Sequence, residues 1–550
     1  MRLRRVLIVL ALALVVSFGF GQTTSSDFPP EALLQRISAA GLRAHMAFLA
    51  DDLLEGRGTG TRGYRLAANY VRAQFEEMGL RPAGVSGSYF QNVRFRQIDL
   101  LTDKSSLTLE HDGSTRTLIL DKDYVMGGNP LSTDMRVEGP VVFVGFGVSA
   151  PEFGYDDYAG IDVRGKIVAA LSGAPSRLPS APGAHFSSSE QKLRVAAEHG
   201  AIGFLSIWAG KPEQRTPFAE YVRFSRGPEL RWLDETGVPN DAQPTIRGYA
   251  RINSSTAAAL FEGAPKSWKD ALRAAENSQP QAFPLATGVS MHAVSRYSEL
   301  ESPNVAAVLP GSDPQLKNEY VVFTAHLDHL GIGEPVKGDS IYNGAADNAS
   351  GVAALLEMAR AFSEMKTAPR RSLLFLAVTG EEEGLLGSDY YAHNPTVPMA
   401  QIVADINMDE VSFLYDFKDI VPLGGEHSSL GAVADDVARH MGLAVSPDPM
   451  PEEVYFIRSD QYSFILQGVP ALYIEEGLQT VNPDLDGKKM QFDWETQRYH
   501  QPSDDMSQPF DFNATVKCTR VDLAVGYEIA QQTERPHWNA GDFFGKFTKH

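Results

Sequence analysis

Cysteine and positive charge are both scarce in this chain of 550 residues. The single cysteine, Cys518, excludes an intrachain disulfide, and we expect it to be a small buried residue. Lys and Arg number 49 against 69 Asp and Glu, which gives a formal net charge of −20. Because binding to a phosphate backbone needs clustered cations, we expect no nucleic-acid partner.

Several motifs of well-known enzyme classes are also missing. The chain has no Gly-x-Ser-x-Gly, which disfavours a serine hydrolase with that nucleophile turn. It has no His-Glu-x-x-His, which disfavours a thermolysin-like zinc protease, and no Gly-x-x-x-x-Gly-Lys-Ser/Thr phosphate loop. Any catalytic chemistry must therefore come from other arrangements of side chains.

The N-terminus is the one place with a pronounced hydrophobic run. Arg2, Arg4 and Arg5 precede an apolar stretch over residues 6–16, and small residues follow before Gln22. A basic start, a short apolar run and small residues are typical of a secretory signal peptide, here residues 1–21. The run is short for a membrane span, although an uncleaved anchor helix is the alternative. We therefore expect export, periplasmic or secreted, with no stable membrane anchor after cleavage.

The length predicts more than one domain, because single hydrophobic cores stop growing at about 250–300 residues. We divide the chain into an N-terminal part of a catalytic domain (22–129), an inserted module (130–290) and the main part of the catalytic domain (291–550). Within the module, residues 215–242 are rich in proline and charge and are expected to form loops.

The C-terminal part alternates apolar runs with amphipathic segments. Residues 320–325, 372–379 and 402–408 are nearly all apolar, and residues 351–365 have helical periodicity. Strands buried on both faces and separated by helices are typical of a parallel sheet. The predicted fold is α/β, with a mostly parallel central sheet flanked by helices and with a β-rich inserted module.

Polar side chains follow the ends of these predicted strands. In such sheets, ligands bind beyond the carboxyl ends of the strands. Carboxylates and imidazoles gathered at that edge would repel one another unless cations lie between them. The residues concerned are His326, Asp328, Asp347, Glu381, Glu382 and Asp409, with His500 in a later loop.

The donor set suits particular metals. Two histidines with three or more carboxylates and no thiolate fit zinc or another borderline divalent ion. The surplus of carboxylates indicates two ions that share a bridging carboxylate, an arrangement that activates water and polarises a carbonyl group. Affinity orders do not distinguish zinc from cobalt or manganese.

The segments around these residues form an ordered set. They are Ala325–His329, Gly344–Gly351, Glu381–Ser388, Asn407–Asp409, Arg458–Asp460 and Tyr499-His500, preceded by Gly56–Gly60. Together they resemble the M28 family of co-catalytic zinc peptidases over about residues 304–504. The inserted module, through residues 154–158 and 165–168, resembles a protease-associated (PA) domain.

The resemblance implies a role for each ligand. His326 and Asp409 would bind one zinc ion, Glu382 and His500 would bind a second, and Asp347 would bridge both.

The resemblance also implies that Glu381 is the general base that takes a proton from water and returns it to the leaving amine. Asp328 would accept a hydrogen bond from His326 and orient it, and Asp504 could do the same for His500. Tyr499 could donate to the oxyanion of the intermediate or could be a packing aromatic.

The expected activity is removal of N-terminal residues from peptide substrates, with the inserted module limiting access to the cleft. A carboxypeptidase-type or dipeptide-cleaving relative is one alternative, in which Arg215, Arg223, Arg226 and Arg231 could hold a substrate carboxylate. A single-zinc glutaminyl cyclase is a second alternative, and a metal-free scaffold is a third. The sequence predicts no particular oligomeric state.

Overall fold

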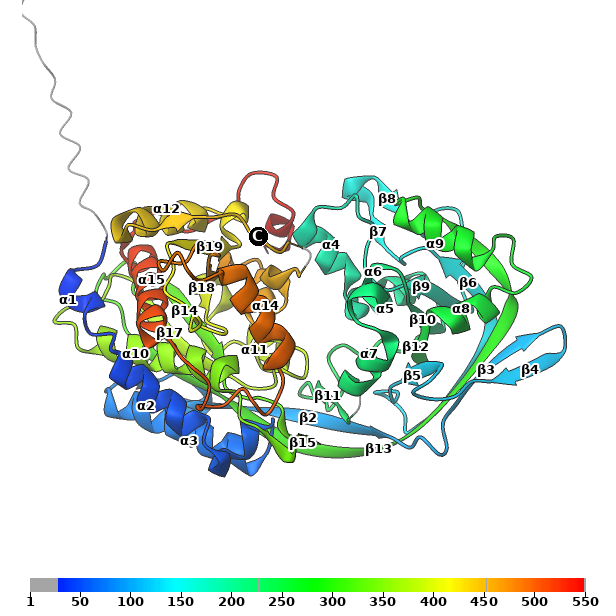
Figure 1. Ribbon diagram of the computed structural model, residues 1–550, viewed down its shortest axis with the longest axis horizontal. Coiled ribbons are helices and arrows are strands. Elements are labelled where there is room, and N and C mark those ends of the chain that lie inside the picture. The colour runs from blue at the N-terminus through cyan, green and yellow to red at the C-terminus, as the bar shows by residue number, and fades with distance from the viewer. Residues whose placement is uncertain (1–27, 226, 452, 549–550) are drawn as a thin grey trace, which may run out of the picture.

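The computed structural model describes residues 28–548 except residues 226 and 452, and it has two lobes joined by long strands (Figure 1). The predicted signal peptide lies outside the described residues. Among the helices of the described part, none is long and apolar enough to cross a bilayer.

The first lobe is built on the mostly parallel sheet that the sequence predicts. Strand β14 pairs in parallel with β17 on one side and with β18 on the other, and β18 pairs in parallel with β21. Antiparallel strands flank this parallel centre, with β13 on β17 and β19 on β21. The bounds are β13 (Ala282–Leu309), β14 (Tyr320–His326), β17 (Ser372–Val378), β18 (Ile402–Asn407), β19 (Asp419–Leu423) and β21 (Ala471–Glu476).

Helices cover both faces of this sheet, so alternate residues of each strand enter different cores. Phe323 packs with one set of helices in the largest core, whereas its neighbour Val322 packs on the opposite face. The first set is α2 (Ala39–Leu49), α3 (Arg62–Glu77), α10 (Gly351–Ser363) and α15 (Phe512–Gln531), and the second includes α11 (Leu386–His393) and α13 (Gln461–Ile465). Burial on both faces explains why these strands are apolar throughout.

The second lobe has its own sheet and cores. Strands β6, β9, β10 and β12 pair in parallel in that order, and β3 pairs antiparallel with the first half of β13. The sheet consists of β3 (Ser106–His111), β4 (Ser114–Thr117), β5 (Tyr124–Met126), β6 (Asp134–Val144), β9 (Ile167–Leu171), β10 (Gly203–Trp208) and β12 (Tyr249–Asn253), together with part of β13. Because β3, β4 and β5 belong to it, this sheet begins before residue 130, which is the boundary placed from the sequence.

One helix of the second lobe, α7, lies in residues 215–242, which were expected to form loops. Residues 215–242 contain α7 and β11, so that expectation was wrong. Helix α7 is too short to show a clear amphipathic pattern, and β11 forms by pairing with β2 (Phe90–Leu100), which is distant in sequence. The bounds are α4 (Ser180–Ser187), α5 (Ser189–Glu198), α6 (Lys211–Arg215), α7 (Phe218–Phe224), α8 (Ser254–Leu260), α9 (Trp268–Glu276), β7 (Ser149–Ala150), β8 (Tyr155–Asp156) and β11 (Glu229–Trp232).

Strand β13 runs through both lobes without a break. Its first half pairs with β6, residues 295–305 pair with β2 (Phe90–Leu100), and its last residues pair with β17. Figure 1 shows β13 and β2 side by side beneath the space between the lobes. Smaller elements complete the first lobe: α1 (Glu31–Leu34), α12 (Leu430–Met441), α14 (Gly487–Gln497), β1 (Arg81–Pro82), β15 (Gly331–Val336), β16 (Asp339–Tyr342) and β20 (Ala444–Val445).

Candidate metal centre

The predicted ligands converge at the carboxyl edge of the parallel strands. His326 ends β14, and its Nε2 lies 3.0 Å from Oδ1 of Asp409 and 3.3 Å from Oδ1 of Asp347. His500 Nε2 lies 3.2 Å from Oδ2 of Asp347 and 3.2 Å from Oε2 of Glu382. The two oxygens of Asp347 therefore face two different imidazoles, each of which has a second carboxylate beside it.

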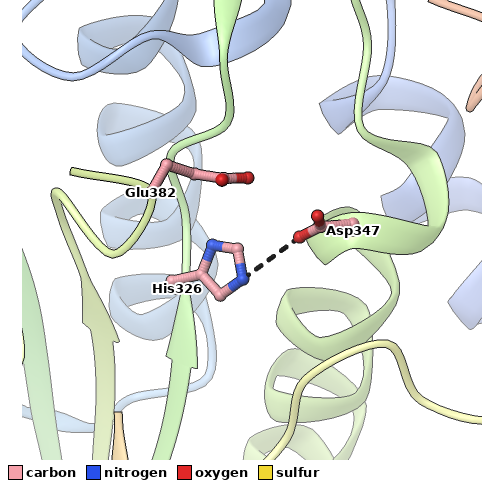
Figure 2. Close-up of side chains that lie close together, drawn as sticks. All are labelled: His326, Asp347 and Glu382. Atoms are coloured by element: carbon pink, nitrogen blue, oxygen red, sulfur yellow. Dashed lines mark ion pairs between the residues drawn. The ribbon is translucent and has the colours of Figure 1, made fainter. Parts of the chain in front are cut away.

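The central three side chains come from separate segments. Figure 2 shows His326, Asp347 and Glu382 directed toward one another, with the ion pair between His326 and Asp347 marked. Each of the three offers a ligand atom, and these atoms all lie within 4.8 Å of one another. Distances of this size leave room for a cation between the groups but not for intervening side chains.

The turn before Asp347 needs glycine. Gly344 has φ of 60°, and a Cβ atom there would lie 2.2 Å from the Asp347 carbonyl oxygen and 2.5 Å from the His329 ring. No side chain fits at that position without moving these groups. The close approach places the carboxylate of Asp347 at the sheet edge beside His329.

His329 is not among the ligands expected from the sequence, but it lies in the centre. Its Nδ1 is 2.6 Å from Oε1 of Glu382 and 3.8 Å from Oδ2 of Asp347. The contact between Nδ1 and Oε1 of Glu382 is an ion pair, and the buried Nε2 of His329 has no hydrogen-bond partner among the described residues. The signal in the sequence was its position one residue after Asp328, at the end of the same strand.

The imidazoles and carboxylates shift each other's protonation strongly. Burial opposes the charged form of Asp347, yet His329, His326 and His500 hold its pKa well below the usual range. Burial acts likewise on Glu382, but His500 and His329 lower its pKa to about 2. The carboxylates therefore stay ionised in a buried site because positive charge lies beside them.

Glu381 lies beside these ligands and differs from them. Its Oε2 is 4.0 Å from His326 Nε2. Burial, followed by the nearby carboxylates Glu382 and Asp409, raises the pKa of Glu381 well above its ordinary value, and His326 opposes that shift. The pKa values of the neighbouring carboxylates Glu381 and Glu382 are therefore shifted in opposite directions.

Asp328 acts through a different atom from the one expected. His326 Nδ1 lies 3.2 Å from the main-chain carbonyl oxygen of Asp328, and not beside its carboxylate. The carboxylate instead accepts hydrogen bonds from the main-chain N–H groups of Glu381 (3.2 Å) and Glu382 (3.4 Å) and from the Thr59 hydroxyl (3.1 Å). Asp328 therefore positions both glutamates as well as the histidine.

Asp504 also differs from expectation. Its carboxylate accepts hydrogen bonds from the main-chain N–H groups of Ala346 (2.9 Å) and Asp347 (3.1 Å), and from the Gln508 side chain. It holds the turn that carries Asp347, and its recorded contacts do not include His500.

Arg57 belongs to the Gly56–Gly60 segment, and the sequence alone did not indicate what its side chain does. Its side chain is fully buried and donates to the main-chain carbonyls of Leu49, Leu327, Asn343 and Gly344 at distances of 2.6, 3.0, 2.6 and 2.9 Å. It therefore connects the end of β14 to the turn before Asp347. Its guanidinium also places positive charge near Asp347, Asp504, Asp328 and Glu382.

Tyr499 has a packing role in the structure. Its ring stacks on His500, with centroids 3.9 Å apart and planes at 22°, and it also contacts Trp494. The stacked ring holds the histidine in place. Donation by the hydroxyl to an oxyanion stays a prediction.

The Arg458–Asp460 segment supports another ligand. The Ser459 hydroxyl donates to Oδ2 of Asp409 at 2.7 Å and accepts from the Asn407 amide at 2.8 Å. Asp409 therefore presents Oδ1 to His326 while Oδ2 is held by Ser459.

The residues fit divalent cations. Imidazole and carboxylate groups face each other in a buried cluster, and part of their polar surface has no hydrogen-bond partner among the described residues. The pKa values of His326 and His500 are raised well above normal by the carboxylates despite burial, so the site has a strongly negative potential. A cation between them would satisfy both sets of groups.

The centre opens into a cavity of about 1210 Å³ between the lobes. Glu381, Glu382 and His500 line it from the first lobe, and Tyr249 and Arg251 line it from the second. The cavity is larger than the roughly 300–1,000 Å³ of a typical small-molecule pocket.

Two of the four arginines that a carboxypeptidase-type enzyme could use to hold a substrate carboxylate already form ion pairs with acidic residues of the chain. Arg231 lies 2.9 Å from Glu229 and 2.9 Å from Asp241, and Arg215 lies 3.1 Å from Glu453. Arg223 is exposed and does not line the cavity, and Arg226 lies outside the described residues.

Comparisons with known proteins agree with this centre. Residues 304–526 match peptidase family M28. A probable zinc metalloprotease of Pyrenophora teres f. teres is 36% identical over 107 residues, which is 20% of this chain and 22% of that protein. Leupeptin-inactivating enzyme 1 of Streptomyces exfoliatus is 36% identical over 120 residues, which is 20% of this chain and 25% of that protein. The match thus spans about a quarter of the length of these relatives.

A solved structure shares the fold over nearly the whole chain. The aminopeptidase from Aneurinibacillus sp. strain AM-1 superposes with a TM-score of 0.54 and 19% identity, covering 92% of this chain and 97% of that one. The α/β architecture predicted from the sequence, with its mostly parallel sheet flanked by helices, is confirmed.

Proposed function

We propose that this chain, whose residues 304–526 match peptidase family M28, is a two-zinc aminopeptidase that removes N-terminal residues from peptides. The observation that carries the proposal is the arrangement of Asp347, whose two oxygens face His326 and His500 separately. A site for a single ion would need only one of these two pairs of an Asp347 oxygen and an imidazole.

The same geometry suggests how the ligands divide. His326 and Asp409 would hold one zinc ion, Glu382 and His500 would hold the other, and Asp347 would contact both. When bound, a zinc pair lowers the pKa of water and polarises a carbonyl group. His329 is the further imidazole beside Glu382 and Asp347.

Glu381 is the proposed general base. Its carboxylate lies at the cavity wall beside the ligands, and its raised proton affinity suits a group that accepts a proton from water and passes it to the leaving amine. Hydrogen bonds from the main-chain N–H groups of Glu381 and Glu382 to Asp328 fix the backbone from which both side chains extend.

An amine-recognising activity is favoured by the charge of the centre. Carboxylates outnumber cations there, and burial, followed by the carboxylates of Asp347 and Asp409, raises the pKa of Glu410 well above its ordinary value, as expected in a negative potential. Such a field attracts the ammonium group of a free peptide N-terminus. The names of two similar proteins, an aminopeptidase and a leupeptin-inactivating enzyme, are consistent with this choice.

Two further proposals concern the rest of the chain. The second lobe would act as a PA-like wall that limits access to short or flexible peptides. Residues 1–21 would direct export, so the enzyme would work outside the cytoplasm.

The test compares substrates with free and blocked amines. Aminoacyl 4-nitroanilides should be cleaved, N-acetylated peptides should not, and a chelator should abolish turnover until zinc is restored. Metal analysis should find two zinc ions per chain. Turnover restricted to amine-blocked peptides would favour the carboxypeptidase-type alternative, and one zinc ion per chain would favour the glutaminyl cyclase alternative.

A further inference from the structure

Arg251 on β12 is a cation that lines the cavity without an acidic partner. Its Nε donates to the Ser206 hydroxyl at 3.3 Å, and its Nη2 lies 3.1 Å from both the Ser189 and the Tyr249 hydroxyls. Within the described part of the chain, no carboxylate forms an ion pair with it, and its Nη1 has no recorded hydrogen-bond acceptor. Its partners are all neutral, so its charge is not compensated.

Aromatic rings hold this guanidinium in place. The Arg251 Cζ lies 4.6 Å from the ring centroid of Tyr221 and 5.1 Å from that of Trp208. These contacts and the three hydroxyls fix the orientation of the group at half-burial. A cation that is already ordered loses less entropy when it binds an anion.

A second basic residue, Lys192, lies near Arg251. Lys192 is buried, and its Nζ donates to the carbonyls of Leu171 (2.8 Å) and Gly173 (2.6 Å). Burial and, second, the charge of Arg251 lower the pKa of Lys192 to about 7. The carboxylate of Asp157, which also acts on Lys192, accepts hydrogen bonds from the Tyr155 hydroxyl and from the main-chain N–H groups of Phe146 and Val148.

Other arginines on the cavity wall differ in this respect. Arg231 has Glu229 and Asp241 beside it, and Arg458 lies 3.5 Å from Glu453. Arg247 also lines the cavity, but it is exposed, whereas Arg251 is half-buried and packed against the Tyr221 and Trp208 rings.

We infer that Arg251 binds the free C-terminal carboxylate of the peptide whose N-terminus lies at the metal centre. The inference rests on the proposed function, because it places the two ends of one substrate against opposite walls of the same cavity. The guanidinium presents N–H groups in the planar arrangement that a carboxylate accepts. Arg251 would be a substrate-binding residue contributed by the second lobe.

This assignment restricts the substrate class. An extended peptide spans at most about 3.3–3.6 Å per residue, so a chain held at both ends has a limited number of residues. The 1210 Å³ cavity exceeds the roughly 300–1,000 Å³ of a small-molecule pocket and can hold a peptide of a few residues. The preferred substrates are therefore short peptides with both termini free.

The first experiment compares kcat/KM for one tripeptide as its free acid and as its C-terminal amide. The wild-type enzyme should prefer the acid by about ten- to a hundredfold, the range for a hydrogen bond between charged groups. Arg251→Gln should remove this preference, and Arg251→Lys should retain part of it.

The matched control is Arg223→Gln, which removes the same charge from an exposed position on α7. This variant should keep the preference for the free acid. A third peptide, amidated at its C-terminus but with an internal glutamate, separates the two sources of a carboxylate. If this peptide is cleaved with the kcat/KM of the free acid, Arg251 binds an acidic side chain, and the assignment to the C-terminus is wrong.

A binding measurement separates this inference from the proposed function. Calorimetry on Glu381→Gln compares binding of the acid and amide forms of the tripeptide with and without Arg251→Gln. Acid-selective binding that needs Arg251 supports the inference even if no amino-terminal cleavage is found. Equal binding of acid and amide, or selectivity that survives Arg251→Gln, overturns it even if the nitroanilide is cleaved.

Discussion

Removing the buried guanidinium of Arg57 should destabilise the first lobe. The four main-chain carbonyls that it contacts would each lose a hydrogen bond from a charged donor, and the Gly344 carbonyl would keep its second donor, the Ala349 N–H at 3.2 Å. The carboxylates of Asp347 and Asp328 would also lose a nearby positive charge. Both effects act in the metal-free protein, where no bound ion compensates.

The magnitude follows from these contacts. A hydrogen bond to a charged group contributes a net of about 1.5–3 kcal/mol, but bonds that share one side chain are not additive. Breaking a buried charged cluster by removing one member costs about 3–5 kcal/mol, and we expect Arg57→Leu to lower the free energy of unfolding by that amount. Arg57→Lys keeps the charge but has fewer donors, so its loss should be smaller.

The assay is urea unfolding of the chelator-treated protein, followed by tryptophan fluorescence. Absence of metal matters because a bound ion would add its own binding free energy to the measured stability. The control is Arg62→Leu in the same region, since Arg62 is exposed and 3.8 Å from Glu55. A loss below about 1 kcal/mol for Arg57→Leu, at the low end of what one unsatisfied buried group costs, would refute the reasoning.

Three other changes test the centre and the second lobe. Glu381→Gln should lower kcat by about 10²–10⁴-fold with unchanged zinc content, measured by nitroanilide turnover and elemental analysis. Asp347→Asn should lower the zinc content below that of the wild type, because the proposed function places Asp347 on both ions. Lys192 has a lowered folded-state pKa of about 7, so the unfolded chain binds the extra proton above that pH. The free energy of unfolding should then rise by about 1.4 kcal/mol per pH unit from pH 7 toward 10, and Lys192→Met should remove this contribution.

Contrary results are equally specific. Full activity of Glu381→Gln would remove the proposed base, whereas loss of zinc from that variant would make it a ligand. Unchanged zinc content in Asp347→Asn would contradict a shared ligand. A pH slope that is the same in wild type and Lys192→Met would show that Lys192 is not the titrating group.

The strands that carry the centre could be predicted from sequence because their environment is uniform. Residues 320–325, 372–379 and 402–408 are buried on both faces, so nearly every position is apolar, and β14, β17 and β18 match them closely. Residues directly after such strands must lie at one edge of the sheet. Local composition was therefore enough to bring His326, Glu381 and Asp409 together.

What could not be predicted depends on contacts between distant segments. The four acceptors of Arg57 come from residues 49, 327, 343 and 344, and no local pattern indicates that they meet. The carboxylate of Asp328 binds main-chain N–H groups more than 50 positions away, and this pairing became visible only in the fold. Helix α7 was missed because it is short and follows Pro217, in a stretch dominated by turn-forming residues.

The continuous strand β13 has a mechanical consequence for the enzyme. Because its 28 residues pair with β6 at one end and with β17 at the other, the lobes are joined by a hydrogen-bonded ribbon rather than by a flexible tether. Any change in the gap between the lobes must bend or twist this ribbon, and its pairing with β2 resists the change. We therefore expect the distance between the lobes to vary only slightly around one value. That distance would then limit the length of the peptides that the cavity accepts.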